Sequence, residues 1–248
     1  MRSKLTPLPK TKRRLVRVGL VFAVLCFGVL GFMELYAPSR QLNFRLDVTF
    51  EVDGQQITGS GVQKFVLSKS IMSFFPGISY DFDIYGDAVI VDLPNRSSVY
   101  VLMNSPRDDG SIDFDSGSYI FFVNSVCKLG EKAGKLGPAG YVRFVGKFTG
   151  SCDVEPKDVP VMVRFEDELD PATVERIFPD KAEQVLGADV KFIGARITIT
   201  DDPVTAGIGD RLTWLSEFGS RSMVSGPSTT NPPFAQIIKH RHFREIEK

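Results

Sequence analysis

Two adjacent carboxylates, Asp201 and Asp202, follow an alternating apolar run and stand directly before Pro203. Paired carboxylates can hold a divalent cation or act as acid and base in hydrolysis. An Asp before a proline can also cap a helix, because its side-chain oxygen accepts hydrogen bonds from the first backbone N–H groups. The same Asp-Pro pair occurs at Asp170. The sequence therefore favours structural caps at Asp170 and Asp202 over a metal site.

Nucleophilic catalysis needs a proton acceptor beside the Ser or Cys nucleophile. The only two histidines, His240 and His242, lie in a polar C-terminal stretch whose composition indicates a solvated basic tail. This placement argues against a histidine-based triad in the folded body. The three cysteines are scattered at positions 26, 127 and 152 and lack the spacing of a zinc site. We expect no catalytic residue, no metal ligand and no cofactor.

An acidic loop follows the first group of predicted strands, and its four carboxylates belong to Asp108, Asp109, Asp113 and Asp115. A calcium-binding loop would need a glycine at its sixth position and a glutamate at its twelfth, and both are missing. The pattern favours a solvated loop. Carboxylates assembled only in the fold leave no local mark, so an envelope hydrolase remains an alternative function. A small-ligand-binding protein is another, since several strands are rich in Phe.

The N-terminus has the features of a membrane anchor. Seven Lys and Arg residues and no acid precede residue 18, and 16 uncharged residues follow Arg17. Residues 15–37 would span about 34 Å as a helix, enough to cross a bilayer. The excess of cations predicts residues 1–14 in the cytoplasm and the body outside. A cleaved signal peptide is the competing interpretation, but the segment before Pro38 lacks the usual small residue of a cleavage site.

The exported body is acidic, with 18 Lys and Arg against 27 Asp and Glu over residues 37–218. Such a body repels phosphate backbones, so we expect no nucleic acid partner. An extracytoplasmic location also favours disulfides, and it makes Cys127 and Cys152 a candidate pair. Two independent buried thiols are the alternative for these cysteines.

Alternating apolar residues predict an antiparallel meander over residues 42–103. Its strands are expected at 42–52, 57–67, 78–85, 88–93 and 98–103. Asp53-Gly54 supplies a hairpin turn, and Gly59 with Gly61 suggests a bulge or a close backbone approach.

The second half mixes helices and strands. Helices are predicted from about residue 118 and over 170–177, 179–187 and 203–215, and strands over 141–148, 159–165 and 190–200. Thr205, Arg211 and Trp214 on the last of these helices form a candidate interaction motif, with anchoring of the helix against the sheet as the other interpretation.

These elements predict an α+β protein: an N-terminal transmembrane helix followed by an antiparallel-sheet-based extracytoplasmic body with a few packed helices. The body covers residues 38–218, as one domain or as two subdomains at 38–105 and 115–218. Residues 219–248 are predicted to be a flexible tail, with a short amphipathic helix near its end.

Several stretches carry a resemblance to a known group. They are "VPVMVRFEDELDPATVERI", "GADVKFIGARITITDDPVTAGI", "RLTWL" and, earlier, "FRLDVTFEVDGQQITGSGV" and "YGDAVIVDLP". The chain resembles, over most of residues 42–215, a group of uncharacterised N-terminally membrane-anchored bacterial envelope proteins with no assigned function. The resemblance implies an inner-membrane protein with a periplasmic body. It implies no catalytic residue, and the tail after residue 219 departs from the group.

The expected function is therefore that of a single-pass inner-membrane protein whose periplasmic domain has an interaction or structural role. Its expected partners are the bilayer, through residues 15–37, and another envelope protein or component. An interaction module should show an exposed apolar patch or a free sheet edge, whereas an enzyme should show a deep cleft with convergent polar groups.

Overall fold

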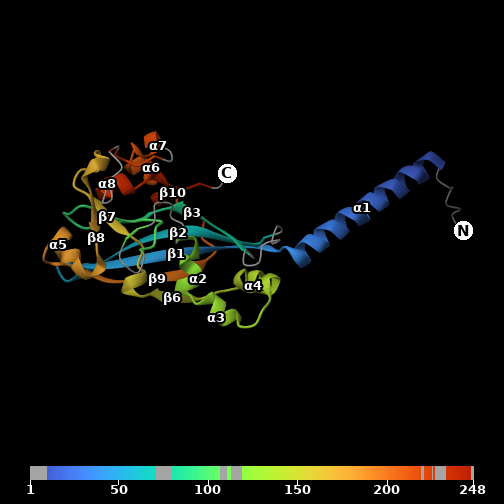
Figure 1. Cartoon of the computed structure of the whole chain (residues 1–248), viewed down its shortest axis with the longest axis horizontal. Coiled ribbons are helices and arrows are strands. Elements are labelled where there is room, and N and C mark those ends of the chain that lie inside the picture. Colours follow the sequence, from blue (N-terminus) through green and yellow to red (C-terminus); the bar gives the residue numbers. More distant parts are fainter. Residues whose placement is uncertain are drawn as a thin grey trace, which may run out of the picture.

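The computed structural model describes residues 10–70, 80–106, 111–112, 119–218, 221–224, 226 and 233–246. One long helix, α1 (Lys10–Tyr36), projects from a body of sheets and short helices (Figure 1). Its Gly19–Tyr36 segment has a mean hydropathy of 2.0 and is not buried by the body, and no other described helix is as long and apolar. An apolar N-terminal helix of this kind serves as a membrane anchor or as a signal sequence.

The larger sheet has six antiparallel strands in the order β10-β3-β2-β1-β9-β6. Its bounds are β1 (Ser39–Val52), β2 (Gln55–Lys69), β3 (Tyr80–Asp87), β6 (Ser151–Val154), β9 (Val190–Thr200) and β10 (Arg244–Glu245). The predicted turn at Asp53-Gly54 joins β1 to β2, and both turn residues have positive φ. Alternate side chains of β1, including Phe44, Leu46 and Phe50, are fully buried, as their spacing predicts.

A second antiparallel sheet contains β4 (Val89–Val91), β5 (Val99–Val101), β7 (Met162–Phe165) and β8 (Val174–Ile177), in the order β4-β5-β7-β8. The predicted single meander is therefore wrong, because β4 and β5 leave the first sheet. Gly59 explains how β4 crosses β2 at close range: a Cβ atom there would overlap the Ile90 carbonyl oxygen. The expected close backbone approach is confirmed.

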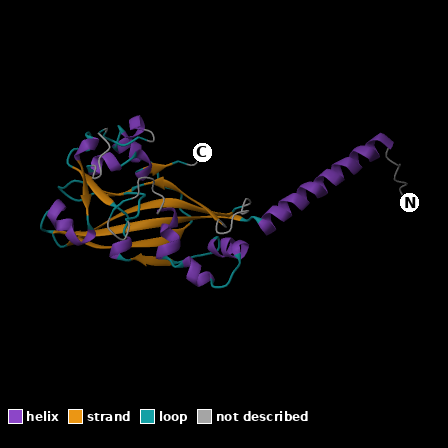
Figure 2. Ribbon diagram, viewed as in Figure 1, coloured by secondary structure: helices purple, strands orange, loops and turns teal. Residues whose placement is uncertain are grey.

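Short helices cover one face of the larger sheet at the end nearest α1 (Figure 2). They are the 3-10 helix η1 (Tyr119–Phe121), α2 (Phe122–Val126), α3 (Leu129–Ala133) and α4 (Pro138–Val145). The strand predicted over 141–148 is wrong. Pro138 begins a helix that buries Tyr141, Val142 and Val145, and these residues share one helical face against the sheet.

Another correction concerns residues 170–177, which were predicted to form a helix. Only one 3-10 turn, η3 (Pro171–Thr173), forms before β8, because residues 174–177 pair with β7 instead. The remaining elements of this region are η2 (Pro156–Asp158), η4 (Pro179–Lys181) and α5 (Ala182–Leu186). The helix predicted over 179–187 is present as η4 and α5.

The C-terminal part contains α6 (Ile208–Arg211), α7 (Leu215–Phe218), α8 (Phe234–Ile237) and η5 (His240–His242) before β10. The prediction of a flexible tail is wrong for residues 233–246, where Ile238, His242 and Phe243 are fully buried. Phe243 packs edge-on against Tyr100 and Trp214, and β10 pairs with β3. The apolar burial of Phe243 therefore holds the end of the chain on the body.

Two apolar cores result. The larger one lies around β1 and contacts the helices near α1, and the smaller one joins the second sheet to the C-terminal elements. The protein is thus an α+β fold of antiparallel sheets with a few short helices.

Candidate binding groove

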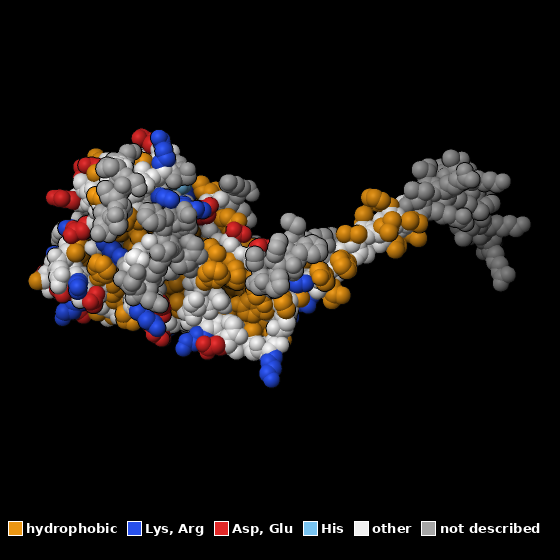
Figure 3. Space-filling model, in the orientation of Figure 1, with side chains coloured by type: hydrophobic (Ala, Val, Ile, Leu, Met, Phe, Trp, Pro, Cys, Tyr) orange, Lys and Arg blue, Asp and Glu red, His pale blue; other side chains and the backbone are white. Residues whose placement is uncertain are grey.

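A groove of about 930 Å³ lies between the outer part of β3 and the short helices. Much of its lining is aromatic or aliphatic, from Tyr80, Phe82, Phe121, Leu136 and Tyr141, and its polar members are Asp81, Asp83 and Asn124. Apolar side chains gather on this end of the body, next to α1 (Figure 3). A concave apolar surface with a few polar groups is the usual form of a binding site.

Aromatic pairs build the wall of the groove. Phe82 packs edge-on against Phe121 with ring centroids 4.9 Å apart, and Tyr80 packs edge-on against Tyr141 at 5.1 Å. Each pair joins β3 to a helical element, so the two sides of the groove are held together. Phe121 is nevertheless 43% exposed and Leu136 is 50% exposed. These two side chains leave apolar area open to solvent.

Two tyrosines contribute neutral polar groups. Tyr141 Oη donates a hydrogen bond to Asn124 Oδ1 at 2.5 Å. Burial raises the pKa of Tyr141 to about 12, and burial also raises the pKa of Tyr80. Both phenols therefore stay protonated near neutral pH, and the groove carries no phenolate charge.

The groove runs beside a sheet edge. β2 pairs with β3 along Tyr80 to Tyr85, while β10 pairs with β3 only at Gly86 and Asp87. In the part of the chain that the structure describes, no strand pairs with the other side of residues 80–85. Such an edge presents backbone N–H and C=O groups to an incoming strand. Asp81 and Asp83 are exposed along it.

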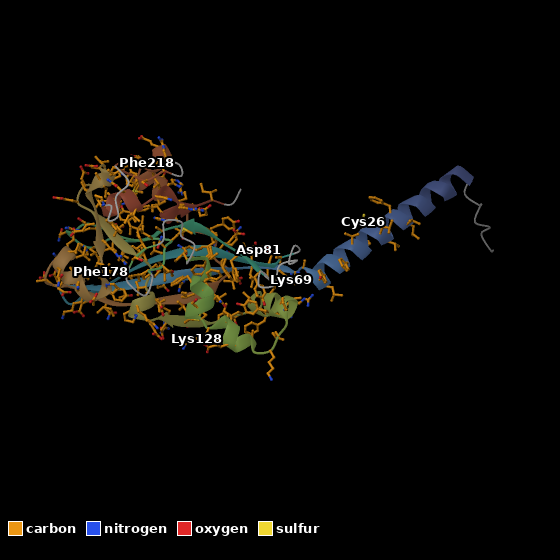
Figure 4. All side chains as sticks on the ribbon, viewed as in Figure 1. Cys26, Lys69, Asp81, Lys128, Phe178 and Phe218 are labelled. Atoms are coloured by element: carbon orange, nitrogen blue, oxygen red, sulfur yellow. A yellow bond between two sulfur atoms is a disulfide. The ribbon has the colours of Figure 1, made fainter. Side chains whose placement is uncertain are left out.

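The groove begins close to the end of α1. Tyr80 stands opposite Lys69 in the β2–β3 register. Lys69 Nζ donates to the Tyr36 carbonyl oxygen at 2.6 Å and lies 3.6 Å from the centroid of the Tyr36 ring. Figure 4 labels Lys69 and Asp81 together at the α1 end of the body. A membrane-spanning α1 would therefore place the groove near the bilayer surface.

A buried polar network fixes β3 and the 3-10 helix η1 on either side of the groove. Asp87 accepts two hydrogen bonds from Arg244, at 2.6 and 2.9 Å, and its backbone carbonyl accepts from Gln63 Nε2 at 2.9 Å. Gln63 Oε1 in turn accepts from Tyr119 Oη at 2.6 Å. Burial raises the pKa of Tyr119 far above its usual range. This chain of bonds links β10, β3, β2 and η1.

Of the residues predicted from the sequence, Cys127 and Cys152 come together. Their sulfur atoms lie at disulfide distance and their Cα atoms are 5.3 Å apart, which suits a disulfide. Asp170 accepts a hydrogen bond from the Ala172 N–H at 2.9 Å and caps η3, so that prediction is confirmed. Cys26 is exposed on α1.

The predicted cap at Asp202 is wrong, because no helix begins there. Thr205 instead holds the chain against β2: its N–H donates to Val62 O at 2.9 Å, and its Oγ1 accepts from Val62 N at 2.8 Å. The segment stays extended, and the next helix, α6, starts at Ile208. The Ile208 N–H donates to the carboxylate of Asp87 at 2.9 Å, so an aspartate distant in sequence takes the role predicted for Asp202.

The other two members of the candidate interaction motif make contacts inside the body. Arg211 pairs with Asp92 at 2.7 Å and with Glu168 at 3.1 Å. Trp214 is buried, and its Nε1 donates to the Glu168 carbonyl oxygen at 2.7 Å. With Thr205, these side chains fasten the C-terminal region to both sheets, which is the anchoring role.

Within the described residues, no group of three or more His, Cys, Asp and Glu side chains is placed to hold a metal ion. The histidines are not in a solvated tail: His242 is fully buried and its Nδ1 accepts from the Lys239 N–H at 3.2 Å. Burial lowers the pKa of His240. The acidic loop residues Asp108, Asp109, Asp113 and Asp115 lie outside the described residues.

The groove leaves no signature in the amino-acid sequence. The alternation of Tyr80, Phe82 and Ile84 with Asp81 and Asp83 indicates a strand with one wet face, and it does not show that the strand borders a groove. Predicting helix at 138–145 would have supplied the opposite wall. Comparisons with known protein families, with characterised proteins and with solved structures find no match for this chain.

Proposed function

We propose that the chain is a single-pass bacterial inner-membrane protein with its N-terminus in the cytoplasm and its body in the periplasm. We further propose that the body is an interaction module that binds an extended segment of another envelope protein in the groove. The exposed apolar segment Gly19–Tyr36 of α1 and the seven Lys and Arg residues before residue 18 support the anchor. The groove and the neighbouring sheet edge support the interaction.

The observation that carries this proposal is the coincidence of an open strand edge with an aromatic groove. In strand addition, backbone hydrogen bonds to the edge supply affinity and pockets for alternate side chains supply specificity. The side chains of β3 alternate between the two faces of the sheet, so Phe82 lies on one face and the exposed Asp81 and Asp83 lie on the other. All three residues border the groove.

The chemistry of the bound segment follows from this alternation. Residues of an added strand share a face with the β3 residues that they stand opposite. Every second side chain would therefore contact Phe82 and Phe121, and should be apolar. The intervening side chains would face Asp81 and Asp83, and should be Lys or Arg. The proposed partner segment alternates apolar and basic residues.

Photo-crosslinking in intact cells tests the groove. A benzophenone amino acid in place of Phe121 should give a discrete crosslinked product, while the same group in place of Phe178, which is 41% exposed at the far end of the body, should not. Adding Asp81→Lys and Asp83→Lys should reduce the product about tenfold, because two favourable charge pairs become repulsive.

A matched control reverses two exposed acids elsewhere, with Asp180→Lys and Glu183→Lys. This control should leave the product at the parent level. Equal products from positions 121 and 178, or a product unaffected by the reversal at Asp81 and Asp83, would count against the groove as the binding site.

The anchor has its own test. A reporter enzyme that is active only outside the cytoplasm, fused after Lys248, should be active, because the excess of cations before the apolar segment of α1 keeps the N-terminus inside. The fusion should also stay with the membrane after alkaline extraction. A shortened body released into the soluble fraction would show that α1 is a cleaved signal sequence.

A further inference from the structure

The helical segment between the two disulfide-forming cysteines is basic, although the body is acidic. Residues 128–147 contain five cations, Lys128, Lys132, Lys135, Arg143 and Lys147, and one acid, Glu131. The rest of residues 37–218 has 13 Lys and Arg against 26 Asp and Glu. This segregation gives α3, α4 and their flanking loops a charge opposite to that of the remaining body.

Contacts of α4 hold this segment beside the end of α1. Arg143 Nη2 donates to the carbonyl oxygens of Glu34 and Leu35, at 2.6 and 3.0 Å. Cations at these positions satisfy the last carbonyls of a helix and interact favourably with its dipole. Gly146, directly after α4, makes room for Arg40: a Cβ atom there would lie 2.6 Å from Arg40 Cγ. Arg40 itself pairs with Glu34.

The segment presents its cations to solvent together with apolar groups. Lys128, Lys132, Lys135 and Lys147 are exposed. Leu136 follows Lys135 in the loop between α3 and α4 and is 50% exposed. Lys132 Nζ lies 4.9 Å from the ring centroid of Phe148. Lysines around exposed apolar side chains are typical of surfaces that rest on anionic membranes.

We infer that residues 128–147 bind anionic phospholipid headgroups of the bilayer that α1 crosses, with Leu136 entering the boundary of the acyl region. The inference rests on the proposed membrane anchorage and is independent of the partner in the groove. The charge complementarity is specific to this surface, since the acidic remainder of the body is repelled by an anionic bilayer. Anchor and basic segment together would fix how the body is oriented on the membrane.

A depth measurement on the full chain tests this contact. The chain carries Cys26→Ser and Leu136→Cys, is labelled with a fluorophore at position 136, and is reconstituted into vesicles of phosphatidylcholine with or without phosphatidylglycerol. With phosphatidylglycerol, a lipid-attached nitroxide should quench the label and the water-soluble quencher acrylamide should not. In phosphatidylcholine alone, acrylamide should quench it.

In a triple variant, Lys128→Gln with Lys132→Gln and Lys135→Gln, acrylamide should quench the label in both kinds of vesicle, as it does for the parent in phosphatidylcholine alone. Each lysine near an anionic surface contributes about a fivefold factor, so the contact equilibrium should shift on the order of a hundredfold. Removing the same charge far from α1, with Lys157→Gln, Lys181→Gln and Lys191→Gln, should leave the quenching at the parent level.

Flotation separates the two ways in which the idea can fail. In one outcome, the chain floats with both kinds of vesicle while acrylamide still quenches the label in vesicles that contain phosphatidylglycerol. This result would retain the anchor and overturn the headgroup contact. The contact is equally overturned if the triple variant near α1 keeps its nitroxide quenching. A chain that floats with neither vesicle overturns the anchorage, and with it this inference.

Discussion

Replacing Asp87 by Ala is expected to lower the free energy of unfolding by about 3 to 5 kcal/mol. The Asp87 side chain is only 5% exposed and accepts from Arg244 Nε and Nη2, at 2.6 and 2.9 Å. It also accepts from the Ile208 N–H at 2.9 Å. The substitution leaves a guanidinium group, itself only 22% exposed, without its counterion, and a buried N–H without its acceptor.

Urea unfolding of the detergent-solubilised chain, followed by fluorescence of Trp214, measures this loss. Trp214 is the only tryptophan, and its ring centroid lies 6.2 Å from that of Phe243, the neighbour of Arg244 in sequence. Arg244→Met in the Asp87→Ala background should recover part of the stability, because it removes the uncompensated charge.

The exposed Asp153–Arg196 pair provides the control. Both of its side chains are more than half exposed, so Asp153→Ala should change the free energy of unfolding by less than about 1 kcal/mol. Equal effects of Asp87→Ala and Asp153→Ala would contradict the structural role assigned to Asp87.

Loss of the Cys127–Cys152 link is the other large expected effect. Replacing both residues by Ala should lower the free energy of unfolding by about 3 to 4 kcal/mol, from the chain entropy of a loop of 25 residues. The link closes the loop that contains α3 and α4, so its removal should loosen the helical wall of the groove first.

The same unfolding experiment with and without reductant separates the crosslink from packing, because Cys127 is buried and its truncation alone leaves a small cavity. Reductant should destabilise the parent but not the double variant, and Cys26→Ala should match the parent. Mass spectrometry that finds both thiols free in protein purified without reductant would contradict the link.

Local signals predicted the parts of the fold that local interactions determine. Alternating apolar residues predicted β1 and β9, the Asp53-Gly54 pair predicted the turn of the first hairpin, and a run without charges predicted α1. Gly59 correctly indicated a close approach, although the strand that comes close could not be named. Each of these features depends on neighbours in sequence or on a missing side chain.

Tertiary contacts decided the parts that were predicted wrongly. Residues 141–145 are mostly aromatic and β-branched, which favours a strand, but they belong to helix α4, which begins at Pro138 and packs Tyr141, Val142 and Val145 against the sheet. Residues 174–177 follow an Asp-Pro helix start and still form β8, because β7 offers a pairing edge. The packing of Phe243 against Tyr100 and Trp214 cannot be read from the polar composition around it.

The groove could not be predicted from the sequence for a related reason. Its walls come from Tyr80 and Phe82 on one side and from Phe121 to Tyr141 on the other, and the open edge depends on the order of strands in the sheet. Strand order is a property of the whole topology. A single strand such as β3 gives no sign of whether it lies at the centre of a sheet or at its border.

Asp87 and Arg244 are 157 residues apart in the sequence, and this separation affects how the chain folds while it is being synthesised. At a synthesis rate of about 5 to 20 residues per second, Asp87 waits roughly 10 to 30 s for its guanidinium partner. Until residues 243–245 have been synthesised, the smaller core lacks Phe243 and β3 lacks its second neighbour, β10. A product truncated before residue 243 would have an unfilled core and a lengthened open edge, and both features favour aggregation or proteolysis.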